Sequence, residues 1–250
     1  MKITVIIPTY NRASFLPKAI QSILVQNGSY DLDILVINDG STDSTSDILT
    51  DLCLHHPQIR TIQQANAGIS AARNTGLQNL LDETQIVTFL DSDDIMPQNR
   101  LAADMALLIG NPDLDLTYGR MMITNALDYN TGAPPKTART IEVCAIHLSC
   151  VLMRRQVWER VGLFDEVFRL SEDTDFIFRI FESGFRFQQV ETLCMYYLRH
   201  ETNITNDTTE AQRHYARAIL RSLQRRKADP NRKLIKPNFD LTPILEQGPI

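Results

Sequence analysis

Three carboxylates lie within four residues in the segment Asp91-Ser92-Asp93-Asp94. The β-branched and aromatic run from Ile86 to Phe89 precedes them and predicts a strand, so the acidic residues are expected where that strand ends. Carboxylates this close repel one another, and a sheet core does not tolerate them unpaired. A hard divalent ion accepts oxygen ligands, so we interpret this acidic cluster as a cation site and expect a substrate that carries phosphate.

Two more polar loops are expected beside the acidic cluster. Residues 3 to 7 predict a first strand that Pro8 ends, and the segment Thr9-Tyr10-Asn11-Arg12 follows it. Residues 32 to 37 predict a second strand, followed by Asn38-Asp39-Gly40-Ser41. In an open parallel sheet the carboxyl ends of the strands converge on a crevice where ligands bind. The three loops are therefore predicted to form one site.

The elements that position these loops alternate between strand and helix periodicity, which is typical of a βαβ layout with a largely parallel sheet. Later segments predict a helix from Pro97, a long loop from Asn125 to Thr140, and a helix from Glu172 to Ser183. They also predict two strands (185 to 190 and 193 to 199), a basic amphipathic helix (209 to 227) and an extended or disordered tail from residue 229.

Composition and charge exclude several classes of protein. At 250 residues and 43% hydrophobic content, the chain can bury a substantial core. A formal charge of −5 argues against nucleic acid as the main partner, because phosphate backbones are bound by basic surfaces. Neither GxGxxG after the first strand nor GxxxxGK[ST] anywhere occurs, so neither a dinucleotide-binding Rossmann domain nor a P-loop site is supported.

The four cysteines have no CxxC spacing and are expected to be reduced packing residues. The apolar run at the start is too short for a signal peptide, and no later segment approaches the ~20 apolar residues of a spanning helix. A cytoplasmic location is therefore expected. The basic helix could contact an anionic membrane surface, which would place the protein at the inner membrane, or its charges could simply be solvated.

Several short segments, taken in their order and spacing, form a pattern that is typical of a known protein family. They are Val5–Arg12, Val36–Asp43, Asn66–Asn74 and Phe89–Asp94, followed downstream by Gly162–Glu166 and Glu172-Asp173. Together they resemble the family 2 glycosyltransferases, and the resemblance covers roughly residues 1 to 205.

The resemblance implies a GT-A fold, in which helices flank a mostly parallel central sheet. It implies a Rossmann-like nucleotide-binding half (1–110), an acceptor and catalytic-base half (111–205), and a C-terminal helix and tail (206–250). The implied activity is an inverting, metal-dependent transfer of a sugar from a UDP- or dTDP-sugar to a hydroxyl acceptor in glycan or polysaccharide synthesis. The acceptor would be a glycan, a lipid-linked molecule or a protein.

By the same resemblance, Asp91-Ser92-Asp93 is the DxD motif of the family. Asp93 would bind Mn²⁺ or Mg²⁺ directly, Asp91 would contact the ribose or the metal shell, and His200 falls where some relatives place a diphosphate or metal contact. Asp173 would be the catalytic base. The residues expected to bind the nucleotide-sugar are Pro8, Thr9, Tyr10, Arg12, Asp39, Arg73, Asp91, Ser92 and Glu172.

Simpler interpretations exist for some of these residues. Asp39 could serve only the turn at Gly40, and Arg73 could be a solvated surface charge. Glu172 and Asp173 could complement a helix dipole, and Asp94 could cap the helix that begins at Pro97. His147 could contact an acceptor or serve packing.

Two other functions remain open. One is a non-catalytic module that binds nucleotide-sugars. An intact Asp173 together with the DxD motif would favour the enzyme over this module. The other is a sugar nucleotidyltransferase, which is less favoured because its glycine-rich nucleotide-binding start is missing.

Overall fold

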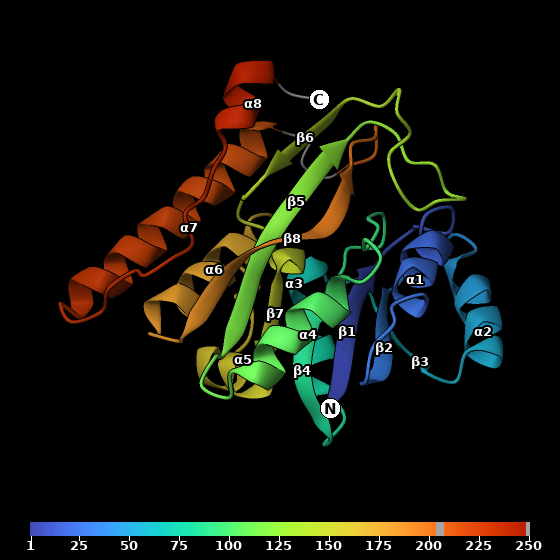
Figure 1. The fold of residues 1–250 in the computed structure, drawn as a ribbon, viewed down its shortest axis with the longest axis horizontal. Helices are drawn as coiled ribbons and strands as arrows, with labels where there is room; N and C mark the ends of the chain where they lie inside the picture. Colours follow the sequence, from blue (N-terminus) through green and yellow to red (C-terminus); the bar gives the residue numbers. More distant parts are fainter. Residues whose placement is uncertain (204–207, 249–250) are drawn as a thin grey trace.

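The computed structural model describes residues 1–203 and 208–248, and its centre is one eight-stranded sheet (Figure 1). The strands lie in the order β3-β2-β1-β4-β7-β5-β6, and β8 pairs with the remaining edge of β5. Their bounds are β1 Lys2–Thr9, β2 Asp31–Asp39, β3 Ile59–Gln64, β4 Thr84–Phe89, β5 Leu116–Thr124, β6 Thr140–Val143, β7 Val151–Arg154 and β8 Phe187–Leu198.

Helices cover both faces of the sheet, which gives three layers (Figure 1). Their bounds are α1 Leu16–Leu24, α2 Thr45–His55, α3 Ile69–Gln78, α4 Arg100–Gly110, the 3₁₀ helix η1 Leu148–Cys150, α5 Arg155–Val161, α6 Glu172–Glu182, α7 Thr208–Ala228 and α8 Thr242–Gln247.

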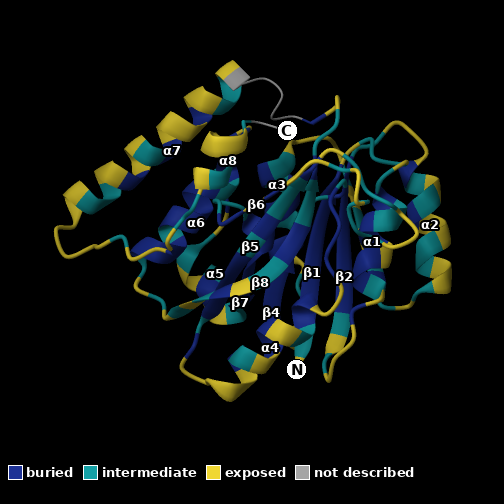
Figure 2. Cartoon of the chain, turned by 45° about the horizontal axis from the view of Figure 1, so that its top comes forward, coloured by how far each residue is buried: buried dark blue, intermediate teal, exposed yellow. Residues whose placement is uncertain are grey.

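The side chains of β1 alternate between two apolar cores. Ile3, Val5 and Ile7 pack toward α1, α2 and α4, whereas Ile6 packs with residues of α3 and α6 on the opposite face. Because both faces are covered, the strand is buried from Ile3 to Thr9, and the central strands are the most deeply buried part of the molecule (Figure 2).

The sheet is mixed but mostly parallel, which confirms the predicted fold class. β1, β2, β3 and β4 pair in parallel, as do β5 and β8, while β7 pairs antiparallel with both β4 and β5. β7 therefore joins strands β1 to β4 to strands β5, β6 and β8. The predicted division at residues 205 and 206 lies outside the described residues and stays a prediction.

Pro8 does not end the first strand, contrary to expectation, because β1 continues to Thr9. The carbonyl of Ile6 accepts from the backbone N–H of Leu90, so the even-numbered residues of β1 face β4. Pairing with β4 ends at Ile6, and the missing N–H of Pro8 therefore faces the side that no strand occupies.

The two strands predicted between residues 185 and 199 form the single strand β8. The interruption in the pattern is a register shift against β5 on either side of Arg120. Next to it, a Cβ on Gly119 would lie 2.5 Å from the carbonyl oxygen of Thr192, so only glycine permits this close approach of the two strands.

The fourth helix begins at Arg100 and not at Pro97, because Asn99 adopts a left-handed conformation with φ 65°. Asp94 does not cap this helix: its Oδ1 accepts from the backbone N–H of Leu198. The long loop between β5 and β6 is confirmed, and Lys18 of α1 lies 3.6 Å from the ring centre of Tyr129 in that loop.

The tail is more ordered than the sequence predicted. Cys144 and Asp240 form a backbone bridge, and Leu234, Phe239 and Ile244 pack against the main core. Residues 229 to 241 form no helix, which agrees with the extended alternative, but helix α8 then follows and the packing contradicts disorder for the described residues up to 248.

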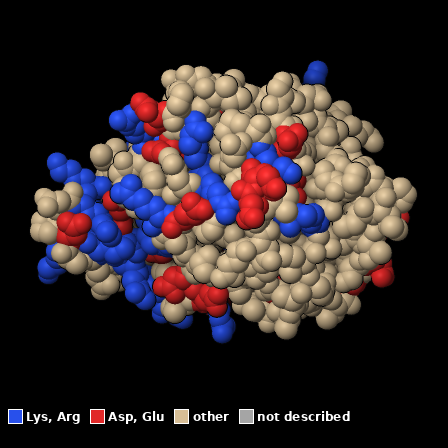
Figure 3. Space-filling model, turned by 90° about the horizontal axis from the view of Figure 1, so that it is seen from below, with Lys and Arg blue, Asp and Glu red and all other residues tan. Residues whose placement is uncertain are grey.

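Helix α7 lies along α6 and buries one stripe, formed by His214, Ala218 and Ser222. Seen from below, Lys and Arg side chains gather at the end of the molecule that α7 occupies (Figure 3). Among the described residues, no helix combines the length and apolar character needed to cross a membrane.

Candidate active site

The three predicted loops meet at the carboxyl edge of the sheet. Thr9 pairs with Asn38 at the ends of β1 and β2, and Ile6 pairs with Phe89 at the end of β4. Asn11, with φ 51°, uses its Oδ1 to accept from the backbone N–H of Thr42, which ties the first loop to the second. The structure therefore brings together the polar segments that the sequence placed at separate strand ends.

Asp93 lies between the side chains of Arg12 and His200. Its Oδ2 accepts from Arg12 Nε at 3.1 Å and lies 3.2 Å from His200 Nε2. Burial alone would raise the pKa of Asp93, but the hydrogen bond with His200 and the charge of Arg12 lower it below its ordinary value. His200 is further positioned by stacking on Phe15, with ring centres 4.6 Å apart.

Arg73 is the central cation of the site. Its guanidinium is buried, donates to Asp91 Oδ1 at 2.8 Å and also donates to Glu172 Oε1. Burial opposes the charge on Arg73, but the charges of Asp91 and Glu172 raise its pKa above the ordinary value. The interpretation of Arg73 as a surface charge is therefore wrong, and its guanidinium links the acidic cluster to the start of α6.

Glu172 and Asp173 open α6, where acidic residues complement the helix dipole. Asp173 Oδ1 accepts from the backbone N–H of Thr174 at 2.7 Å. Burial raises the pKa of Glu172 to about 7, the charge of Arg73 acts in the opposite direction, and the charge of Asp173 adds to the rise. The predicted base thus lies at the same site as Asp91, joined to it through Glu172 and Arg73.

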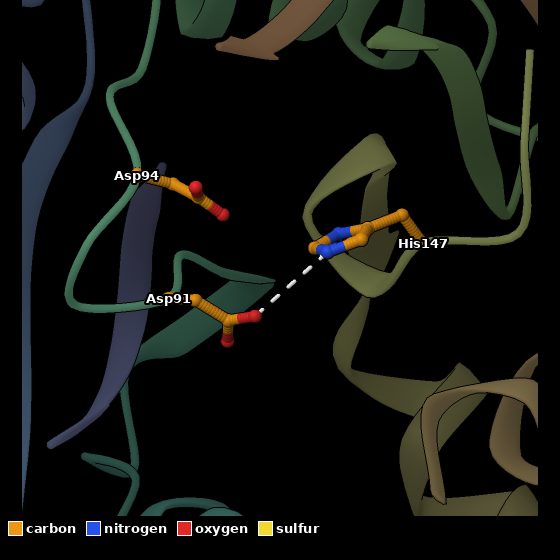
Figure 4. A group of neighbouring side chains, drawn as sticks. All are labelled: Asp91, Asp94 and His147. Carbon is orange, nitrogen blue, oxygen red and sulfur yellow. Dashed lines mark ion pairs between the residues drawn. The ribbon is translucent and has the colours of Figure 1, made fainter. Parts of the chain in front are cut away.

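Asp91, Asp94 and His147 form a second group, in which one ligand atom from each lies within 4.8 Å of the others (Figure 4). Asp94 is 1% exposed, and its Oδ2 has no hydrogen-bond partner among the described residues. Burial and the charges of Asp93 and Asp91 raise the pKa of Asp94 well above its ordinary value. A buried carboxylate oxygen without a partner, in one group with a second carboxylate, fits a divalent cation.

Sequence reasoning missed the contributions of Asp94 and His147. The position of Asp94 as third member of the acidic run was an available signal, although we treated it as a possible helix cap. No sequence signal connected His147 with Asp91, because the two meet only through the pairing of β4 with β7.

Asp39 holds the loop that precedes α3. Its Oδ1 accepts from Gln64 Nε2 and the backbone N–H of Ala67, and its Oδ2 accepts from the backbone N–H of Gly68. A Cβ on Gly40 would lie 2.7 Å from the backbone nitrogen of Asn66, so glycine is required for this close approach. Asp39 therefore holds the loop before α3 in addition to forming the turn at Gly40.

The remaining predicted residues lie on the same edge. The hydroxyl of Thr9 is buried and has no partner among the described residues, Tyr10 is 45% exposed, and Ser92 is buried. Pro8 lies one residue before the end of β1. Their roles toward a nucleotide-sugar stay predictions.

Taken together, a mostly parallel sheet between helix layers, with an acidic cluster at its carboxyl edge, defines an α/β domain of the GT-A type. Residues 4–162 match the family described as Glycosyl transferase family 2, and the chain belongs to this family. The predicted family and the prediction of a glycosyltransferase domain are confirmed.

Curated relatives show the same family over parts of their length. Glycosyltransferase GlyA of Streptococcus pneumoniae is 46% identical over 98 residues, which are 39% of this chain and 14% of the relative. The uncharacterized glycosyltransferase EpsJ of Bacillus subtilis is 29% identical over 81% of this chain and 62% of its own length. The chain thus spans less than two thirds of either relative.

Solved structures share the fold. TarS of S. aureus aligns with a TM-score of 0.66 at 22% identity, over 88% of this chain and 40% of that one. The mannosyltransferase PcManGT of Pyrobaculum calidifontis aligns with a TM-score of 0.68 at 19% identity, over 89% of this chain and 64% of that one.

The raised pKa of Glu172 predicts a dependence of stability on pH. A carboxyl group whose pKa rises on folding stabilises the folded state while protonated, so this contribution is complete below pH 4.5 and is lost as pH rises through about 7. Between pH 4.5 and 8, the unfolding free energy of wild type should fall relative to that of Glu172→Gln. Urea unfolding of both proteins across this range measures the difference, and parallel pH profiles would contradict the prediction.

Proposed function

We propose that this chain transfers a sugar from a nucleotide-diphosphate sugar to a hydroxyl acceptor, with inversion at the anomeric carbon. The observation that carries the proposal is the placement of Asp91, Arg73 and Glu172 in one buried ion-pair network beside Asp173. The network holds an acidic cluster from one half of the molecule against a carboxylate from the other half. Inversion requires only one positioned base, on the face opposite the leaving group.

Asp173 is the base in this proposal. It takes the proton of the acceptor hydroxyl as that oxygen attacks the anomeric carbon, while the bond to the diphosphate breaks. The ion pair of Glu172 with Arg73 fixes the first turn of α6 and so positions Asp173. Its role follows from this placement, not from an unusual basicity.

Asp91 and Asp93 would hold Mn²⁺ or Mg²⁺, with His200 as a further ligand. The bound ion would stabilise the negative charge that develops on the departing diphosphate. One observation supports a cation here: the Oδ2 of Asp94 has no hydrogen-bond partner among the described residues and belongs to one group with Asp91.

The proposed donor is a UDP- or dTDP-sugar. Asp39 would accept from the N3–H that uracil and thymine share, while it continues to hold the loop before α3. Structures of TarS with UDP and UDP-GlcNAc, and of PcManGT with GDP-Man and Mn²⁺, support a nucleotide-sugar donor for this fold.

The proposed acceptor is a hydroxyl of a glycan, a lipid-linked molecule or a protein. Relatives named chondroitin synthase (25% identical, Pasteurella multocida) and minor teichoic acid biosynthesis protein GgaA (29% identical, Bacillus subtilis) support a place in glycan or polysaccharide synthesis. Neither a bare binding module nor a nucleotidyltransferase is favoured, because the family match accompanies an intact set of acidic residues.

A contact with the inner membrane surface is proposed for α7. Its outer face carries Leu220 and Leu223, which are 58% and 48% exposed, beside Arg213, Arg217 and Lys227. Exposed leucines between basic side chains fit an anionic lipid interface, where the charges meet headgroups and the apolar groups enter the acyl boundary. The gathering of basic residues at this end supports the proposal (Figure 3).

Asp173→Asn should reduce sugar transfer by about 100-fold or more, because general base catalysis contributes 10²–10⁴ in rate. Donor affinity should stay unchanged, since the amide has the same shape. Mass spectrometry of products, from a panel of UDP- and dTDP-sugars with Mn²⁺, measures transfer, and Glu159→Gln on the surface of α5 is the control. Wild-type turnover in the variant would remove Asp173 as the base, and pyrophosphate release would indicate a nucleotidyltransferase.

Asp93→Ala should weaken the Mn²⁺-dependent affinity for UDP by about tenfold or more, because even groups that only support a metal ligand change affinity about 10–100-fold. Calorimetric titration of UDP with and without Mn²⁺ separates the metal-dependent part. Asp47→Ala, at an exposed carboxylate of α2, is the matched control. Unchanged metal-dependent affinity in Asp93→Ala would exclude Asp93 as a ligand.

Co-sedimentation with vesicles tests the proposed membrane contact. Wild type should pellet with phosphatidylglycerol vesicles and not with phosphatidylcholine vesicles, since the anionic headgroups attract the basic face. Leu220→Ser with Leu223→Ser should reduce binding several-fold, whereas Leu54→Ser, at an exposed leucine of α2, should not. Equal binding to both vesicle types would exclude the charge-driven contact.

A further inference from the structure

The ring of His147 is fixed by the backbone around it. His147 precedes η1 as its N-cap, and its Nδ1 accepts from the backbone N–H of Ser149 at 3.3 Å. Its own backbone N–H donates to the hydroxyl of Tyr118 at 3.1 Å. The ring also meets Tyr197 edge to face, with centres 5.8 Å apart. The side chain is only 13% exposed, so its direction is set by the fold.

This arrangement decides which nitrogen of His147 carries the proton. Because Nδ1 accepts a hydrogen bond, the neutral imidazole has its hydrogen on Nε2. Nε2 is the atom that faces Asp91 (Figure 4). It therefore presents an N–H donor to the acidic group and not a lone pair, so His147 is not suited to bind a cation through this atom.

The facing carboxylate supplies the complementary acceptor. Asp91 Oδ1 is taken by Arg73, whereas its Oδ2 lies 3.8 Å from His147 Nε2. That distance exceeds the roughly 2.7–3.2 Å of an N–H···O hydrogen bond, so donor and acceptor face each other without bonding directly. An oxygen that both accepts and donates satisfies both groups. Water and a sugar hydroxyl have this capacity, whereas a phosphate oxygen would place a second anion against Asp91.

We propose that His147 Nε2 and Asp91 Oδ2 together recognise one hydroxyl of the transferred sugar. This inference rests on the proposed function and assigns a specificity-determining role within it. Asp91 follows β4 in the first half of the molecule, and His147 precedes β7 in the second half. Through Arg73, Asp91 is also joined to Glu172 beside the proposed base. In the proposed function the acidic cluster would hold the diphosphate and Asp173 would meet the acceptor, so the hydroxyls of the transferred sugar would lie near Asp91.

His147→Asn separates recognition of the sugar from support of the fold. Asparagine is a favoured N-cap residue, so it retains an acceptor for the backbone N–H of Ser149, but its shorter side chain withdraws the donor from Asp91. A thermal-shift screen of wild type with UDP-glucose, UDP-galactose, UDP-GlcNAc and GDP-mannose first selects the sugar nucleotide that gives the largest shift. The probes are then this sugar nucleotide and the nucleoside diphosphates UDP and GDP, all with Mn²⁺. His55→Asn, at a side chain of α2 that is 68% exposed, is the matched control.

The variant should bind the sugar nucleotide about 3- to 10-fold more weakly by calorimetry, the loss that one hydrogen bond accounts for. Its affinity for the parent nucleoside diphosphate should stay unchanged, which also reports an intact site. Among monodeoxy donors, one deletion should weaken wild type and leave His147→Asn with no further loss, and that position identifies the hydroxyl.

Two results would overturn this inference. If His147→Asn also loses Mn²⁺-dependent affinity for the nucleoside diphosphate, His147 is a metal ligand. If its affinity for the sugar nucleotide is unchanged, His147 does not contact the sugar. Failure of the proposed function is distinct from both, because wild type would then bind no sugar nucleotide and release no transfer product.

Discussion

A buried guanidinium between two carboxylates is the constraint around which this site is built. Arg73 comes from α3, Asp91 from the end of β4 and Glu172 from the start of α6, so one side chain joins three elements. Removing a charge from water costs several kcal/mol and is offset only when paired, well-oriented partners accept its hydrogen bonds. The fold therefore has to bring both acids to Arg73 in order to bury it. That requirement places the proposed base, Asp173, beside the acidic cluster.

The other acidic side chains of the site are also compensated by nearby cationic or hydrogen-bonding groups, with one exception. Asp93 is compensated by Arg12 and approached by His200, and Asp91 is compensated by Arg73. Asp94 is buried without a cation of its own, and one of its oxygens has no partner among the described residues. The protein thus neutralises two of the three clustered acids with its own side chains and leaves the third to be compensated by a proton or by a bound cation. This imbalance is the physical reason to expect a metal ion here.

Local patterns predicted the first half of the fold well, because each strand and helix there buries an apolar stripe with its own period and ends in a polar loop. They failed where a long-range contact overrides the local signal. Pro8 fits inside β1 because β4 stops earlier, and the apparent break within β8 is a register shift beside Gly119. Likewise the motifs placed Arg73 at the site, but its partners were visible only in three dimensions. His147 was beyond reach because its neighbour Asp91 is far away in sequence.

The C-terminal tail changes what counts as the independent unit of this protein. The family match ends at residue 162, yet Phe239 packs edge to face on Tyr118, the residue whose hydroxyl accepts from the backbone of His147. A shortened chain that stops after the last recognisable motif would lose the apolar side chains of the tail that pack on the main core. It would also weaken the support of Tyr118, and through Tyr118 that of His147, which faces Asp91. The segment that homology defines is therefore smaller than the segment that must fold together, and truncation boundaries are better drawn from packing than from alignment.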